Sequence, residues 1–310
     1  VNDMKYVIGI DGGGSGSTLK IFSEDGVEVG AAVGGPTNIS AQPAYEVKSI
    51  LESLINEGLT NAKVNIDDVA AICIGAAGAG RERQASILKE LIADIGIKGN
   101  IVIKDDTHIA LVAGAGKEEG IIVIAGTGSI AYGRTTEGRS FRAGGWGHII
   151  GDEGSAYYIG VKAINEALKS YDGRSGSTAL LPMILEAIGA DSVDQLVEYV
   201  YRGEFSKSKI AKLARVVDEV FKKGDKTAKS ILEESAYELF LLADAVIKAL
   251  DMTDTVLVTS GSVLLKNKFI FDNFYSLVKA NYPSLKISKL NKDPAYGAVH
   301  IALKHLQGRC

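Results

Sequence analysis

Apolar positions near the start of the chain form two short runs separated by a glycine-rich turn. Residues 6–10 are apolar, Asp11 ends this run, residues 12–16 are four glycines and a serine, and residues 19–22 form the second run. This spacing predicts a strand, a tight turn and a second strand. Because consecutive glycines adopt unusual backbone angles and carry no side chains, their N–H groups can close on an anion. The turn is therefore a candidate phosphate-binding loop.

The same pattern returns about a hundred residues later. Residues 120–125 are mostly apolar, residues 126–129 read Gly-Thr-Gly-Ser, and residues 130–134 continue as a second strand-like segment. Either copy alone could be an ordinary hairpin. Two copies at matching places predict a chain that is duplicated internally, with one phosphate-binding turn in each half.

Two common phosphate motifs are absent from these positions. A dinucleotide-binding fingerprint needs a third glycine where Ser17 stands, and the segment after the turn is strand-like rather than helical. A Walker motif needs Ser or Thr after Gly116-Lys117, but Glu118 is there. The glycine turns therefore point to a different class of phosphate-binding protein.

Beyond the first hairpin, strand-like and helical patterns alternate. The expected elements of the first half are a strand over 27–33, a helix over 44–57, a strand over 69–75, a helix over 83–95 and a strand over 101–103. The second half adds a mostly helical insertion over 170–250, a strand over 255–259, a helix over 264–282, an edge strand over 286–288 and a final helix over 294–306. This alternation predicts an α/β fold.

Several loops of the first half carry candidate ligand-binding residues. Asn38 lies between a strand and a helix, and its alternative role is that of a turn or helix-cap residue. Gly78 belongs to a turn of small residues that would let another group approach the backbone. Asp105 and Asp106 follow a parallel strand, where α/β sheets place ligands, although Asp106 could simply cap the next helix.

The most distinctive segment of the second half is GGWGHIIGDEGSAY, residues 144–157. It holds Trp146, the chain's single tryptophan, and Asp152, which precedes a predicted helix. Trp146 could be a core residue or an aromatic face for a ligand. Asp152 could complement the helix dipole or bind a ligand.

Composition narrows the class of protein. The chain has 310 residues, 46% of them hydrophobic and 23% charged, and a net charge of −4, which fits a soluble globular protein of two domains rather than a nucleic-acid-binding one. No apolar run is long enough to span a membrane, and the first residues do not resemble a signal peptide. With two cysteines and no disulfide framework, we expect a cytoplasmic protein without nucleic-acid or membrane partners.

Five motifs together resemble the N-acetylglucosamine kinase branch of the BadF/BadG/BcrA/BcrD ATPase family. These motifs occupy residues 11–15, 126–129, 144–157, 259–262 and 293–298, in that order along the chain. The wider group contains sugar kinases, Hsp70 and actin. The resemblance implies two ribonuclease H-like (actin-like ATPase) domains with an ATP cleft between them.

The expected domains are 1–117 and 118–293, with the final segment 294–310 packing back on the first domain. The resemblance also implies an ATP-dependent kinase that phosphorylates the 6-hydroxyl of an amino sugar, N-acetylglucosamine first, with glucosamine or a wider range of hexoses as alternatives. A homodimer is the family expectation. The rivals from other classes are an ATPase that activates a dehydratase, for which the two cysteines suit an iron–sulfur cluster poorly, and a sugar sensor or assembly protein without catalysis.

The resemblance implies a role for each motif residue. Asp106 is the expected general base, with Asp105 left as the alternative, and Asp11 is expected to order Mg²⁺ through its water shell. The expected sugar-binding residues are Asn38, Gly78, Gly145, Trp146 and Asp152. The expected ATP-binding residues are Gly13, Gly14, Ser15, Thr127, Gly128, Gly224, Gly261 and Ser262.

Overall fold

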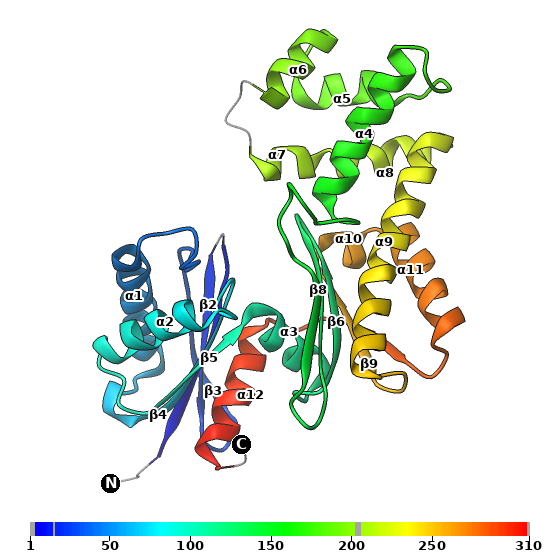
Figure 1. The fold of residues 1–310 in the computed structure, drawn as a ribbon. Helices are drawn as coiled ribbons and strands as arrows, with labels where there is room; N and C mark the ends of the chain where they lie inside the picture. Colours follow the sequence, from blue (N-terminus) through cyan, green and yellow to red (C-terminus); the bar gives the residue numbers. More distant parts are fainter. Residues whose placement is uncertain (1–3, 15, 202–205, 309–310) are drawn as a thin grey trace. The chain divides into compact units, whose positions relative to one another are not determined.

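The computed structural model describes residues 4–14, 16–201 and 206–308 (Figure 1). The chain divides into two compact units. The first comprises Val1–Glu119 and Leu290–Cys310, and the second is the continuous segment Gly120–Lys289. The sequence pattern placed these divisions at 117 and 293.

A five-stranded mixed sheet forms the centre of the first unit, in the order β3-β2-β1-β4-β5. β1 is antiparallel to β2 and parallel to β4. The strands are β1 (Tyr6–Gly12), β2 (Ser17–Ser23), β3 (Glu28–Gly34), β4 (Val69–Ala76) and β5 (Asn100–Asp105). The helices are α1 (Ala44–Ala62), the short 3₁₀ helix η1 (Ile66–Asp68), α2 (Glu82–Asp94), α3 (Asp106–Ala115) and α12 (Ala295–Leu306).

Alternating side chains of β1 pack into two separate hydrophobic cores, one on each face of the sheet. Ile8 and Ile10 pack with α1 and α2 on one face of the sheet, whereas Val7 packs with α3 and α12 on the other. This is the period of two that a strand buried on both faces imposes. Cys73 lies in the second of these cores and is fully buried.

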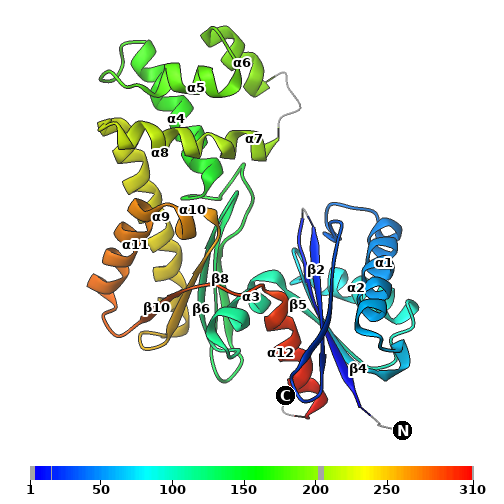
Figure 2. The ribbon, with the colours of Figure 1, turned by 180° about the vertical axis from the view of Figure 1, so that it is seen from behind.

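The second unit repeats the sheet topology of the first. Its strand order is β10-β9-β6-β7-β8, so that β6, β7 and β8 correspond to β1, β2 and β3, and the parallel strands β9 and β10 correspond to β4 and β5 (Figure 2). These strands are β6 (Gly120–Ala125), β7 (Ser129–Arg134), β8 (Ser140–Gly144), β9 (Val256–Ser260) and β10 (Lys286–Lys289). The predicted α/β class and the predicted duplication are therefore confirmed.

Most helices of the second unit lie between β8 and β9 in the sequence. They are α4 (Ala156–Tyr171), α5 (Leu180–Ile188), α6 (Val193–Tyr201), α7 (Lys207–Lys212), α8 (Ala214–Lys222) and α9 (Lys226–Leu250), and two more follow β9, α10 (Ser262–Lys266) and α11 (Lys268–Asn281). The long helix α9 packs against β6, β7 and β8 of the sheet. The helices α4 to α8 pack on one another and contact α9 through α4 and α8 (Figure 1). α11 packs against α9, and α10 contacts β6 and β9 of the sheet.

Two predicted elements differ from those observed. The first helix continues to Ala62 rather than residue 57, because Leu59 keeps to its buried face, and it ends where Lys63 adopts a left-handed conformation with φ 56°. The single helix expected over 264–282 is two helices, α10 and α11. Asn267 separates them because its backbone is extended rather than helical. Its side chain then caps α11 by accepting the N–H of Ile270.

Candidate active site

The first glycine turn joins β1 to β2 and is held by two backbone hydrogen bonds, one within the turn and one from Thr37. Gly13 N–H donates to the carbonyl of Gly16 at 3.0 Å, and Thr37 N–H donates to the carbonyl of Gly13 at 3.1 Å. A Cβ on Gly12 would lie 2.6 Å from Oγ1 of Thr37, and one on Gly13 would lie 2.8 Å from the Gly16 carbonyl oxygen. Glycine is therefore required at both positions. Ser15 lies outside the described residues.

Asp11, at the end of β1, belongs to a group of three acidic side chains in the first unit. Burial raises the pKa of Asp11 to about 7, and the negative charges of Asp293 and then Asp106 add to the rise. Asp293 precedes α12 and accepts the N–H of Ala295 at 2.8 Å. Such a concentration of negative charge would be relieved by a cation, and Mg²⁺ bound through its waters needs only one or two carboxylates. Among the described residues, no three metal-ligating side chains converge closely enough to hold a metal directly.

The two adjacent carboxylates Asp105 and Asp106 lie in different surroundings. Both oxygens of Asp105 lie against Gly80, where an added Cβ would be 2.5 and 2.6 Å from them. Asp106, the first residue of α3, accepts the N–H of Thr107 at 2.8 Å and is near enough to Asp11 to raise its pKa. Burial raises the pKa of Asp106 itself. These surroundings favour Asp106 over Asp105 as a proton acceptor near Asp11.

Asn38 and Gly78 lie in two loops that meet. Asn38 Oδ1 accepts the N–H of Ser40 at 3.0 Å, which is the turn geometry proposed as its alternative role. Its Nδ2 is the atom nearest to a Cβ added on Gly14, at 3.9 Å. Gly78 has φ 81°, and an added Cβ would lie 2.5 Å from Oγ of Ser40. The structure thus brings Asn38 beside the first glycine turn and Gly78 beside the Asn38 loop.

The second glycine turn joins β6 to β7 and rests on the start of α4. The carbonyls of Gly126 and Thr127 accept the N–H groups of Ala156 and Tyr157, at 2.9 and 3.4 Å. The Ser155 side chain caps α4 by accepting the N–H of Tyr158 at 3.2 Å. This packing turns the carbonyls of the loop toward the helix.

Asp152 is buried beneath this second turn. Its side chain is 4% exposed, one carboxylate oxygen accepts the N–H of Ser129 at 3.1 Å, and the other pairs with the ammonium group of Lys207. Its backbone has φ 66°, an uncommon conformation for a residue other than glycine and one that concentrates at functional sites. Asp152 therefore does more than complement the α4 dipole. Sequence reasoning missed Lys207, because a lysine that pairs 55 residues away leaves no local pattern.

Trp146 follows two glycines with left-handed backbones, Gly144 with φ 72° and Gly145 with φ 69°. The indole is 60% exposed, so the core alternative for Trp146 is wrong. The Arg142 guanidinium lies over its ring, 4.4 Å from the centroid. Arg142 occupies one face of the ring, and the rest of the exposed ring is accessible to a ligand.

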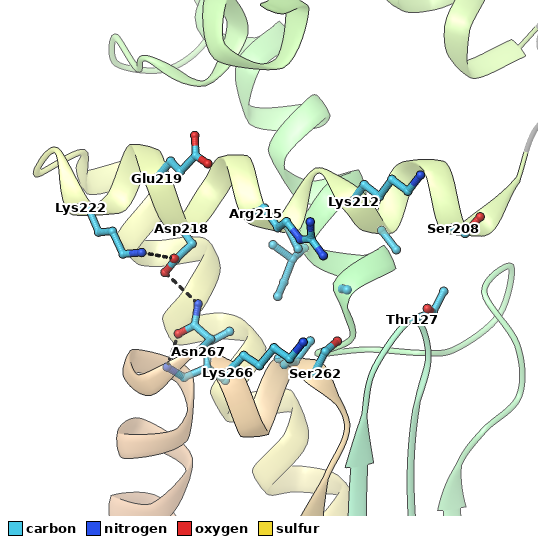
Figure 3. Close-up of a pocket in the computed structure, with 16 residues that line it drawn as sticks. Thr127, Ser208, Lys212, Arg215, Asp218, Glu219, Lys222, Ser262, Lys266 and Asn267 are labelled. Carbon is cyan, nitrogen blue, oxygen red and sulfur yellow. Dashed lines mark hydrogen bonds and ion pairs between the residues drawn. The ribbon is translucent and has the colours of Figure 1, made fainter. Parts of the chain in front are cut away.

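A cavity of about 480 Å³ lies in the second unit, between the α7–α8 segment and α10 (Figure 3). Thr127 and Ser262, two of the expected ATP-binding residues, line it. Figure 3 shows Arg215 of α8 pointing toward Lys266 and Ser262 on the opposite wall. Asn267 donates to Asp218 at 3.1 Å, which fixes the two walls to each other. The volume is in the range of small-ligand sites.

Three expected ATP-binding glycines of the second unit, Gly128, Gly224 and Gly261, are not among the residues that line this cavity. Gly261 has φ 85° and lies so close to Ala125 that a Cβ would be 2.3 Å from its carbonyl oxygen. Gly224 has φ 87° in the turn between α8 and α9. The charged wall from α8 was missed from sequence, because its charges have the spacing of an ordinary solvated helix.

The chain belongs to the BadF/BadG/BcrA/BcrD ATPase family, which matches residues 8–302. It is 48% identical to the N-acetylmuramic acid/N-acetylglucosamine kinase of Clostridium acetobutylicum over 301 residues, 96% of this chain and 98% of that protein. It is 30% identical to the N-acetyl-D-glucosamine kinase of Dictyostelium discoideum over 309 residues, 96% of this chain and 97% of the other. The resemblance inferred from the motifs is therefore confirmed.

A solved structure from Chromobacterium violaceum, provisionally assigned as an N-acetylglucosamine kinase, shares the fold. It superposes with a TM-score of 0.76 at 24% identity and covers 97% of this chain and 99% of its own. Within the part of the chain that the structure describes, no helix is both long and apolar enough to span a membrane.

Proposed function

We propose that the protein transfers the γ-phosphoryl group of ATP to the 6-hydroxyl of an amino sugar, with N-acetylglucosamine as the preferred acceptor. The observation that carries this proposal is Asp106, a half-buried carboxylate with a raised pKa, near Asp11, which directly precedes the first glycine turn. The kinases to which the chain is 48% and 30% identical support the substrate class. The name of the first supports N-acetylmuramic acid as a second acceptor.

Phosphoryl transfer needs a bound triphosphate, an acceptor hydroxyl in line with it and a group that takes the hydroxyl proton. In this proposal Asp106 accepts that proton. Its raised pKa makes the carboxylate a stronger base and narrows the gap to the pKa of the sugar hydroxyl. Thr127 and Ser262 bind the nucleotide at the cavity of the second unit. When bound, Mg²⁺ would neutralise phosphate charge, and Asp11 would hold its water shell.

The proposed sugar-binding residues come from loops rather than from the sheets. Trp146 offers its exposed ring, and Asn38 offers its side-chain amide nitrogen to sugar hydroxyls. Asp152 has its two oxygens on the Ser129 N–H and Lys207, so in this proposal it supports the site rather than contacting a hydroxyl directly. Gly145 and Gly78 have left-handed backbones at these loops, which bring main-chain groups to the ligand.

The experiment measures ADP release with Mg-ATP and a panel of acceptors. The panel contains N-acetylglucosamine, N-acetylmuramic acid, glucosamine, N-acetylmannosamine, glucose and water alone. We expect N-acetylglucosamine to raise turnover far above the rate with water. Asp106→Asn should lower kcat by roughly a hundredfold or more, the usual value of a general base, and leave ATP binding intact.

Asp105→Asn is the matched control, and it should retain far more activity than Asp106→Asn. Turnover that ignored every sugar would contradict the kinase proposal and favour an ATPase activator or a sensor. Preference for glucosamine or glucose would correct only the acceptor.

Because the pKa of Asp106 is raised, kcat/KM should fall as pH is lowered through the acid range, where the carboxylate takes up a proton and can no longer act as a base.

A further inference from the structure

The second glycine turn has two backbone donors available for an anion. Its carbonyls are taken by the first amides of α4, and Gly126 N–H donates to the carbonyl of Gly128 at 2.9 Å. Across the described residues, the N–H groups of Thr127 and Gly128 have no hydrogen-bond acceptor. Consecutive amides of this kind form a concave site for phosphate oxygens.

The ammonium group of Lys207 lies directly beside this turn. A Cβ added to Gly128 would be 2.8 Å from the Lys207 nitrogen and 2.8 Å from Oδ1 of Asp152. Lys207 is the first residue of α7, and its neighbour Ser208 lines the cavity together with Thr127. The start of α7 therefore faces both the turn and the cavity.

Lys207 offsets the negative charge that Asp152 places beside the turn. Asp152 is a buried carboxylate next to Gly128, and alone it would repel a polyphosphate. One ammonium proton of Lys207 is directed at Asp152, and an ammonium group carries three. Its side chain keeps 30% of its surface exposed, so that a ligand can reach it.

We infer that Lys207 is a phosphate-binding residue of the nucleotide site, held beside Gly128 by Asp152. This inference rests on the proposed use of ATP. In it, Asp152 fixes the ammonium group while the amides of Thr127 and Gly128 and the Lys207 charge bind the phosphates together. A charge-assisted contact of this kind contributes about a factor of ten to affinity.

The test compares binding of ADP and of adenosine by calorimetry, without any sugar. Lys207→Met keeps the length of the side chain and removes its charge. We expect it to weaken ADP binding roughly tenfold and leave adenosine binding unchanged, because adenosine has no phosphate. Lys207→Arg should restore most of the ADP affinity. Lys209→Met, on an exposed position of the same helix, is the matched control and should bind ADP like the wild type.

A second variant separates phosphate binding from simple neutralisation of Asp152. In the double variant Lys207→Met/Asp152→Asn the buried negative charge is gone, and we expect ADP binding to remain weak. Recovery of ADP affinity in the double variant would overturn the inference, as would equal losses for ADP and adenosine or unchanged ADP affinity in Lys207→Met. Failure of the proposed function would be seen in the ADP-release assay instead, as wild-type turnover that no sugar stimulates.

Discussion

Burial of the Asp11 carboxylate lowers the stability of the folded protein, although the proposed binding of Mg²⁺ requires its negative charge. Its pKa of about 7 means that the folded protein binds a proton that the unfolded chain, with an ordinary pKa near 3.8, has already released. The unfolding free energy therefore decreases as pH rises between these two values, and the full cost is present above about pH 7. Below the ordinary pKa, both states are protonated and the cost disappears.

Asp11→Asn should consequently stabilise the protein while abolishing turnover. The pKa shift corresponds to at most about 4 kcal/mol, and we expect the variant to gain roughly 1–3 kcal/mol of unfolding free energy near pH 8, without nucleotide or metal. The gain should vanish near pH 4. Urea unfolding at both pH values measures it.

Asp25→Asn, in an exposed turn, is the control for loss of one negative charge. Equal stability of Asp11→Asn and the wild type near pH 8 would show that Asp11 carries no folding cost. A gain that persisted near pH 4 would show a cause other than ionisation.

At the scale of elements, the crossing of α3 and α12 depends on one glycine. A Cβ on Gly297 would lie 1.9 Å from the carbonyl oxygen of Ile109 and 2.8 Å from the backbone nitrogen of Ala113. Both neighbours are backbone atoms inside α3, so they cannot rotate away. The two helices can approach this closely only because residue 297 has no side chain.

Gly297→Ala should therefore destabilise the first unit despite the higher helix propensity of alanine. We expect a loss of roughly 1–3 kcal/mol, the usual cost of overpacking, in thermal or urea unfolding. Gly176→Ala is a suitable control, since an added Cβ meets nothing within 4 Å there. Similar stabilities for the two variants would refute the close-packing argument.

Elements of the sheets could be predicted from sequence more fully than the helices around the site. Alternating apolar residues and glycine turns are local signals, and they identified the paired hairpins of residues 6–22 and 120–134. Lys207 and Asp152 are 55 residues apart, so their pairing is a property of the packed insertion. Likewise, nothing local to Asp105 and Asp106 shows that one faces Gly80 and the other lies near Asp11.

At the scale of the whole molecule, the first unit is discontinuous in sequence and the second is not. α12 supplies Ala298, Val299, Ile301 and Ala302 to the core that covers one face of the first sheet. The second unit, Gly120–Lys289, contains its own sheet and its own core. The two units should therefore differ in their ability to fold alone.

A fragment of residues 120–289 should unfold cooperatively by circular dichroism, whereas a fragment of residues 1–119 should not. Adding a peptide of residues 290–310 should restore a cooperative transition to the shorter fragment, because it returns α12 to the exposed sheet face. A scrambled peptide of the same composition is the control. Cooperative unfolding of residues 1–119 alone would show that α12 is dispensable for this unit.

The position of α12 also sets the order in which the protein can be completed during translation. The ribosome makes α3 by residue 115 but reaches α12 only at residue 295. At roughly 5–20 residues per second, the face of the first sheet that α12 covers waits about ten to several tens of seconds in the nascent chain. During that interval the core around Val7, Ala71 and Cys73 has α3 but lacks the residues that α12 supplies, while the whole second unit is being synthesised.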